Sequence, residues 1–276
     1  MKREFMGNNR ERPIGIFDSG VGGLTVVKQI LNELPNENII YFGDTARVPY
    51  GTKSRETITH FAIQDVRFLL SFDVKMIIVA CNSVSSNSIE MLKKRFDVPI
   101  IGVIEAGAEA ACYYSKQKKI GIIGTDATVE SNAYERHIRE KCKAELIYSR
   151  SCPLFVPLAE EGFTEGEIPE KIANKYLEHF KDIKVDTLVL GCTHYPLLAG
   201  IIQKIMGNNV KLIDPGIEVS KKVRNILNIN DMYNDSVYKG EAKYYLSDIP
   251  RRFEKVAGNF LGGPISSVIK IVIDDF

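Results

Sequence analysis

Two cysteines occupy the same local setting, one in each half of the 276-residue chain. Cys81 and Cys192 each follow an apolar run of strand length, residues 74–80 and 185–191, that ends in a small residue. Small polar residues follow both cysteines. One thiol in each half of a duplicated chain suggests chemistry on two opposite faces of one small molecule, which is the geometry needed to invert a stereocentre.

The elements expected to position these thiols alternate along the chain. Apolar runs and amphipathic stretches follow one another, a pattern that predicts βα units around parallel sheets. We expect strands over residues 14–17, 39–42, 76–80, 100–103, 120–123, 146–148, 188–190 and 210–213. We expect helices over residues 24–34, 55–72, 85–96, 131–142, 168–180 and 218–227, and a weak strand over 269–273. Ligands bind beyond the carboxyl ends of strands in such sheets, where both cysteines fall.

Further matches between the two halves support a duplication. The run 14–17 resembles 120–123, and 98–101 matches 210–213, in the same order as the two cysteines and at a nearly constant offset. The alternative is that all parallel strands look alike, because they are runs of Val, Ile and Leu. The shared order favours two related α/β halves, with the segment after residue 214 packed onto one of them.

The overall composition excludes several classes of protein. The chain is 45% hydrophobic and 26% charged with a formal charge of +1, so it has no overall field to attract nucleic acid or an anionic membrane. No stretch approaches the roughly 18 apolar residues of a membrane span. We expect residues 1–12, which are polar, to be a disordered lead-in and no signal peptide. The five cysteines include no CxxC pair, which fits a reduced cytoplasmic compartment.

Each of the two matched cysteines leads into a predicted helix. A helix N-terminus carries partial positive charge, so we expect the pKa of both thiols to fall below the ordinary value of about 8.5. The alternative is that a free cysteine is simply a small buried hydrophobe. The matched pair favours function for Cys81 and Cys192, whereas Cys112, Cys142 and Cys152 lack this setting and are expected to be structural.

A glycine-rich turn, residues 18–23, follows the first predicted strand. Its glycines do not occupy the G-x-G-x-x-G positions of a dinucleotide site, and a carboxylate before the turn would repel phosphate. Asp18 and Ser19 suit an ammonium group or a thiol proton; their alternative role is to cap the next helix. In the loop 44–53, proline and glycine hold an irregular backbone whose amides can face an anion.

His194 lies two residues after Cys192 and is a candidate acid or base partner for that thiol. A metal site would need more ligands, and no Cys/His pair elsewhere has zinc-like spacing. Glu160 and Glu161 follow the apolar run 152–158, which indicates either a partly buried acid or a solvated pair. No lysine has a clear Schiff-base setting for pyridoxal phosphate. We expect neither a metal nor a cofactor.

Together these residues resemble a known family, the cofactor-independent aspartate/glutamate racemases, and within it the bacterial glutamate racemases. The resemblance covers nearly the whole chain and is specific because four motifs occur together: Phe17-Asp18-Ser19-Gly20-Val21-Gly22-Gly23-Leu24-Thr25, Gly43-Asp44-Thr45-Ala46-Arg47-Val48-Pro49-Tyr50-Gly51, Ala80-Cys81-Asn82 and Gly191-Cys192-Thr193-His194-Tyr195-Pro196. One departure follows Asn82. The family usually has threonine and alanine there, whereas this chain has Ser83, which keeps the hydroxyl, and Val84.

The resemblance implies a role for each matching residue. Cys81 and Cys192 correspond to the two catalytic bases, Asp18 to the acid that assists the first, and His194 with Glu160 to the pair that assists the second. Substrate contacts are implied for Asp18, Ser19, Tyr50, Gly51, Asn82, Ser83, Thr193 and His194, with Thr125 and Thr128 as weaker candidates.

The resemblance also implies the architecture and the biological role. We expect an α/β fold of two similar domains with mostly parallel sheets, related by a pseudo-twofold axis, with the active site in the cleft between them. Residues 1–104, completed by 215–276, would form the first domain and residues 105–214 the second. The implied function is cofactor-independent interconversion of L- and D-glutamate, which supplies D-glutamate for peptidoglycan synthesis in the cytoplasm. The small-molecule substrate would be the partner, without nucleic acid or membrane, and the resemblance allows a homodimer.

Three other functions fit part of the pattern. The same scaffold could racemise aspartate or another acidic substrate. A non-catalytic two-domain binding protein would bind a ligand without exchanging its α-hydrogen with solvent deuterium. A thiol redox protein would need its two sulfurs within disulfide distance, which leaves no room for a substrate between them.

Overall fold

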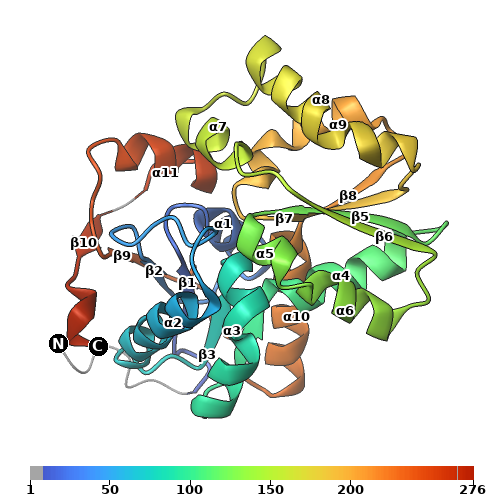
Figure 1. Cartoon of the computed structure of the whole chain (residues 1–276). Coiled ribbons are helices and arrows are strands. Elements are labelled where there is room, and N and C mark those ends of the chain that lie inside the picture. The colour runs from blue at the N-terminus through green and yellow to red at the C-terminus, as the bar shows by residue number, and fades with distance from the viewer. Residues whose placement is uncertain (1–8, 266) are drawn as a thin grey trace.

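The computed structural model describes residues 9–265 and 267–276, which form ten strands arranged in two parallel sheets (Figure 1). The larger sheet has the order β10-β9-β2-β1-β3-β4 and the smaller one the order β6-β5-β7-β8. The strands are β1 (Ile14–Asp18), β2 (Ile39–Gly43), β3 (Met76–Val79), β4 (Ile100–Gly102), β5 (Lys119–Gly124), β6 (Leu146–Ser151), β7 (Thr187–Gly191), β8 (Lys211–Ile213), β9 (Ala242–Leu246) and β10 (Val268–Lys270).

The two sheets repeat one strand order. In the larger sheet β1 lies between β2 and β3, with β4 beyond β3; in the smaller sheet β5 lies between β6 and β7, with β8 beyond β7. Every one of these pairs is parallel. The strands matched in sequence, 14–17 with 120–123, therefore hold the same central position. The predicted fold class, two similar α/β domains with parallel sheets, is confirmed.

Helices cover the faces of both sheets, as the alternating pattern predicts (Figure 1). They are α1 (Leu24–Glu33), α2 (Arg55–Leu70), α3 (Asn82–Arg95), α4 (Val103–Tyr114), α5 (Asp126–Glu130), α6 (Ala133–Lys141), α7 (Phe155–Glu161), α8 (Glu167–Asp182), α9 (Ala199–Met206), α10 (Pro215–Ile229) and α11 (Phe253–Leu261), with 3-10 turns η1 (Tyr195–Leu198) and η2 (Ile273–Asp275).

Several predicted boundaries were wrong by a few residues, for local reasons. Helices α3 and α10, predicted to begin at residues 85 and 218, begin three residues earlier, at Asn82 and Pro215. Asp214 caps α10 by accepting a hydrogen bond from the backbone N–H of Gly216 at 2.8 Å, and a proline suits the first helical position. Val103, expected to end a strand, begins α4 instead.

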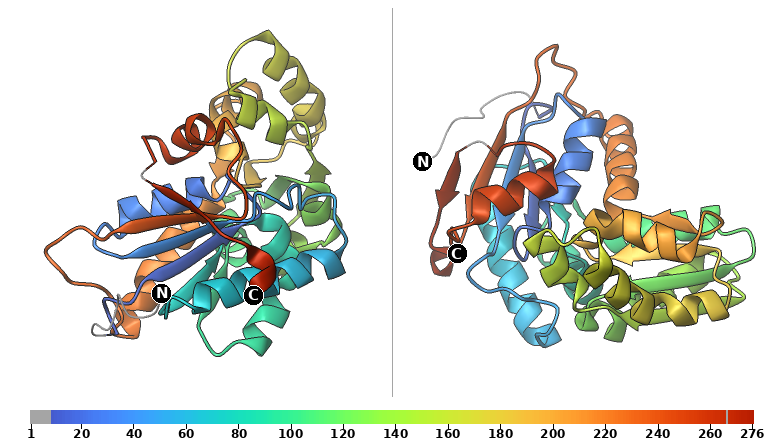
Figure 2. Two further views of the ribbon diagram at one scale, coloured as in Figure 1. Left: turned by 90° about the vertical axis from the view of Figure 1, so that its left-hand side faces the viewer. Right: turned by 90° about the horizontal axis from the view of Figure 1, so that it is seen from above.

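The C-terminal segment returns to the larger sheet. β9 pairs with β2, and β10 pairs with β9, so both extend this sheet at its β2 edge (Figure 2). The weak strand expected over 269–273 is shorter than predicted, because Ile273 begins η2. Helix α11 was not predicted; it packs on α1. These pairings support the division into 1–104 with 215–276, and 105–214, which we propose as the domain limits.

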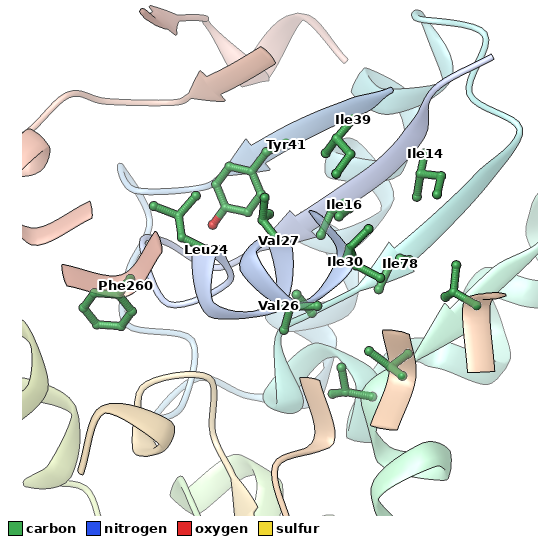
Figure 3. Packing of buried hydrophobic residues seen from close by; sticks show 14 of the residues in the cluster. Ile14, Ile16, Leu24, Val26, Val27, Ile30, Ile39, Tyr41, Ile78 and Phe260 are labelled. Atoms are coloured by element: carbon green, nitrogen blue, oxygen red, sulfur yellow. The ribbon is translucent and has the colours of Figure 1, made fainter. Parts of the chain in front are cut away.

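A buried apolar cluster fixes α1 on the larger sheet. Ile14 and Ile16 of β1 pack in this cluster with Leu24 of α1 and Phe260 of α11 (Figure 3). All four side chains are at most 1% exposed, and burial of such a side chain contributes about 1.5–3 kcal/mol. The packing sets the place of the glycine-rich turn that joins β1 to α1.

The state of the cysteines differs in part from the expectation of reduced thiols. Cys112 and Cys142 form a disulfide that joins α4 to the residue after α6, while Cys81, Cys152 and Cys192 are free and buried. The packing of α4 against α6 brings the two Cα atoms to 5.9 Å. Tertiary packing forms this pair from cysteines 30 residues apart, which CxxC spacing does not reveal.

The N-terminal expectation is corrected for the residues that the structure describes. Residues 1–8 lie outside that part of the chain. Arg10 forms ion pairs with Asp231 and Asp235, and Arg12 with Asp73, so residues 9–12 are not a disordered lead-in. Within the described ranges, no helix combines the length and apolar character needed to cross a membrane.

Candidate active site

A cavity of about 360 Å³ lies beyond the carboxyl ends of strands from both sheets and contains both matched thiols. Its walls come from the loops and helices that follow these strands. The lining residues are Ser19, Gly20, Val21, Val48, Pro49, Tyr50, Gly51, Thr52, Cys81, Asn82, Ser83, Thr125, Asp126, Pro153, Val156, Pro157, Glu160, Cys192, Thr193 and His194.

Cys81 is the N-cap of α3 and lies two residues beyond Val79, the last residue of β3. Its Sγ lies 3.6 Å from the hydroxyl oxygen of Ser19, and only 5% of the residue is exposed. Burial and the nearby Asp18 carboxylate raise the pKa of Cys81 to about 12, although backbone and Ser19 hydrogen bonds oppose this. The expectation of a lowered pKa is wrong for this thiol, because desolvation outweighs the effect of the helix N-terminus.

Asp18 is fully buried behind this thiol and is not part of the cavity wall. Its Oδ2 accepts a hydrogen bond from the N–H of Gly20 at 3.0 Å, which holds the carboxylate inside the turn. Burial raises the pKa of Asp18, against the opposing effects of His194 and of backbone N–H groups in the turn. Because Asp18 is buried close to Cys81, the protonation state of its carboxyl group affects the pKa of the thiol.

Cys192, His194 and Glu160 form a chain of polar contacts. Cys192 Sγ lies 3.7 Å from His194 Nδ1, and His194 Nε2 lies 2.9 Å from Glu160 Oε1. Burial lowers the pKa of His194, but its hydrogen bonds to Cys192 and Glu160 outweigh burial and raise it to about 10. A protonated imidazole donates from both nitrogens, so His194 can exchange a proton with the thiol while the carboxylate holds the ring. Glu161 instead pairs with Arg252 at the surface.

The glycine-rich turn of the first half touches the second thiol's loop directly. A Cβ on Gly22 would lie 2.3 Å from Thr193 Oγ1 and 2.5 Å from His194 Cε1. The Thr25 hydroxyl also donates to the Thr193 carbonyl at 2.9 Å. Only glycine at position 22 permits this approach, so the turn serves to bring the two halves together at the site.

A second set of contacts joins the halves on another side of the cavity. The hydroxyl groups of Ser83 and Thr125 lie 3.0 Å apart, and the Ala127 N–H donates to the Gly51 carbonyl at 2.9 Å. Thr128 contacts the Thr125 hydroxyl but does not line the cavity. The two halves therefore contact each other on two sides of the site.

The loop containing Tyr50 is held by a buried polar network. The Tyr50 hydroxyl donates to Asp44, so it turns away from the cavity that the rest of the residue lines. Arg47 pairs with Asp44 at 2.6 Å and with Asp65 at 3.2 Å. This network fixes the backbone of Tyr50 and Gly51 at the cavity wall, where peptide groups rather than the phenol face a ligand.

Every predicted site residue lies at the cavity wall except Asp18 and Thr128, which are buried beside it. The structure adds lining residues to which the sequence alone assigned no catalytic or substrate-binding role: Gly20, Val21, Val48, Pro49, Thr52, Asp126, Pro153, Val156 and Pro157. Asp126 follows β5, and Pro153 and Pro157 follow β6. The rule that ligands bind beyond strand ends, applied to every strand rather than to the cysteine strands alone, would have found them.

Two duplicated parallel sheets with a shared cavity, lined by one thiol from each, define a class of two-domain α/β enzymes that act on small molecules. The chain belongs within this class to the Asp/Glu/Hydantoin racemase family, whose model matches residues 14–219.

Similar proteins cover almost the whole chain. It is 44% identical over 263 residues to a glutamate racemase of Geobacter metallireducens, and the aligned region covers 95% of this chain and 97% of that protein. It is 46% identical over 259 residues to a glutamate racemase of Chlorobaculum tepidum, spanning 94% and 95%. A crystal structure of Francisella tularensis glutamate racemase in complex with D-glutamate has a TM-score of 0.90 and 43% identity, covering 97% of this chain and 100% of that one.

Proposed function

We propose that this protein interconverts L-glutamate and D-glutamate by a two-base mechanism that uses Cys81 and Cys192 and no cofactor. One observation supports this most directly: two free thiols, one from each duplicated half, line one cavity of about 360 Å³. The similarity to glutamate racemases over nearly the full length selects glutamate as the substrate.

In this mechanism one thiolate removes the Cα proton while the opposite thiol delivers a proton to the other face. We propose that Cys192 takes the proton from L-glutamate, assisted by His194 and Glu160, and that Cys81 takes it from D-glutamate, near Asp18. As the Cα–H bond breaks, negative charge builds on the substrate carboxylate. Backbone N–H groups and the side chains of Asn82, Ser83 and Thr193 at the cavity wall are placed to stabilise that charge.

Because the pKa of Cys81 is raised to about 12, its role as a base requires that substrate binding change the surroundings of the thiol. Burial is the larger cause of the raised pKa of Cys81 and the Asp18 carboxylate is the other, and the substrate brings an ammonium group. A positive charge near Asp18 and Ser19 would offset the carboxylate's effect and favour the thiolate. We therefore propose that the Cys81 thiolate forms in the substrate complex, where it is needed.

The proposal includes the family's biological role, supply of D-glutamate for peptidoglycan synthesis, with the cytoplasm as the location. Location is tested by fractionating cells that express the protein at its native level. Recovery in the membrane or secreted fraction would contradict it.

The function is tested by incubating the purified protein with L-glutamate in deuterated water, without added cofactor and with a chelator. Optical rotation should fall to zero while the α-hydrogen exchanges for deuterium. Binding without exchange would indicate a binding protein instead. Equal kcat/KM for aspartate or glutamine would contradict glutamate as the substrate, since donors matched to a side-chain carboxylate fit a neutral amide poorly.

A further inference from the structure

Tyr134 links the two halves of the site without lining the cavity. It lies in α6 and is 2% exposed. Its hydroxyl donates to Asn82 Oδ1 at 2.7 Å, a hydrogen bond from the second half of the chain to the residue after Cys81. Asn82, in contrast, is part of the cavity wall. Tyr134 is therefore separated from a ligand by one side chain, through which it can act.

Two glycines fix the position of the Tyr134 ring. Its Cε1 lies 3.2 Å from where a Cβ on Gly107 would be, and its Cε2 lies 3.2 Å from the same point on Gly191. Gly191 ends β7 directly before Cys192. A ring held between these backbones has little freedom, so the direction of its hydroxyl is set by packing. Through its ring near Gly191 and its hydroxyl on Asn82, Tyr134 therefore contacts the segments that present both thiols.

The hydrogen bond decides which end of the Asn82 carboxamide faces a ligand. A carboxamide has an acceptor oxygen at one end and a donor NH₂ at the other, in nearly the same shape. With Oδ1 engaged by the Tyr134 hydroxyl, Nδ2 is left for the cavity. Without the hydroxyl, the carboxamide could turn over and present its oxygen to a substrate carboxylate, which would repel it.

The neighbourhood of Asn82 indicates which carboxylate it meets. Cys81 must reach the Cα proton of the substrate, and Asn82 follows it in the chain and begins α3. The α-carboxylate is bonded to that same Cα, whereas the side-chain carboxylate is two methylene groups away. We propose that Tyr134 is a positioning residue that orients the Asn82 carboxamide so that its NH₂ group donates to the substrate α-carboxylate. This inference rests on the proposed racemase function.

The test is a double-mutant cycle of Tyr134→Phe and Asn82→Ala, with kcat and KM measured for both enantiomers. Tyr134→Phe keeps the ring and removes the hydroxyl. We expect KM to rise about tenfold for both enantiomers with a much smaller change in kcat, the size expected for one hydrogen bond. In the Asn82→Ala background, Tyr134→Phe should cause no further loss of kcat/KM, because it acts through Asn82.

The matched control is Tyr176→Phe, which also removes a hydrogen-bonded hydroxyl in the second half. That hydroxyl accepts from the Leu154 N–H at 3.3 Å, and Tyr176 does not line the cavity. Its kcat and KM should equal those of the wild type. Thermal unfolding of all variants separates a loss of stability from a loss of orientation.

Three outcomes would overturn the inference. If the wild type racemises glutamate and Tyr134→Phe has an unchanged KM, the role of Tyr134 is contradicted, whereas the proposed function is not. If the losses of kcat/KM are additive in the double variant, Tyr134 acts independently of Asn82. This conclusion holds even if Tyr134→Phe lowers the stability of the protein. A wild type that does not racemise glutamate contradicts the proposed function, and this inference with it.

Discussion

The close approach of Gly22 to the loop after Cys192 predicts a large loss of activity from the addition of one methyl group. In Gly22→Ala the new Cβ would lie 2.3 Å from Thr193 Oγ1 and 2.5 Å and 2.6 Å from His194 Cε1 and Nδ1. Ordinary contacts begin near 3.4 Å, so these atoms must move apart by roughly 1 Å. The imidazole that assists Cys192 would shift with them.

A displacement of this size at reacting groups costs about 100-fold in rate, or roughly 3 kcal/mol of transition-state stabilisation. We therefore expect kcat/KM of Gly22→Ala to fall about 100-fold in both directions, because an equilibrium constant near one ties the two values together. Overpacking should also lower the free energy of unfolding by about 1–3 kcal/mol, which leaves the protein folded.

The assay follows racemisation of each enantiomer by circular dichroism, with urea unfolding of the same preparations. Gly200→Ala is the matched control. It adds a methyl group in α9, where nothing lies within 4 Å of the new Cβ, and should keep full activity and gain about 0.5–1 kcal/mol of stability. A kcat/KM of Gly22→Ala within about threefold of the wild-type value would refute the reasoning, because the halves could then separate by about 1 Å without loss of activity.

Three further predictions concern the polar groups of the site. Cys81→Ser and Cys192→Ser should each abolish racemisation, because serine is too weak an acid to act as the base at neutral pH; full activity in either would exclude the two-base mechanism. Asp18→Asn should lower kcat more from D- to L-glutamate and His194→Asn more from L- to D-glutamate, with offsetting changes in KM; equal effects in both directions would remove the assignment of helpers. Because the pKa of His194 is raised from 6.5 to about 10 in the folded protein, its contribution to stability is complete below pH 6.5 and lost as the pH rises to about 10. The difference in free energy of unfolding between wild type and His194→Asn, measured at several pH values, should shrink over this range; a difference that grows would reverse the sign of the argument.

The amino-acid sequence by itself determined the fold class and the thiol pair. Strands buried on both faces need continuous apolar runs, and helices that cover them need one apolar face, so both patterns are local and visible. The equivalence of Cys81 and Cys192 was also visible, because each lies directly after such a run. The family motifs added the expected partners Asp18 and His194, since they adjoin strand ends in the chain.

The tertiary structure alone decided which residues meet across the two halves. Nothing near Tyr134 in the chain indicates that its hydroxyl reaches Asn82, and the need for glycine at position 22 arises only from contact with Thr193. The disulfide of Cys112 and Cys142 likewise depends on the packing of two helices. The pKa of Cys81 was predicted with the wrong sign because a helix N-terminus is a local feature, whereas burial is set by the whole fold. Contacts between residues far apart in the chain, and the desolvation that they cause, have no local pattern from which to infer them.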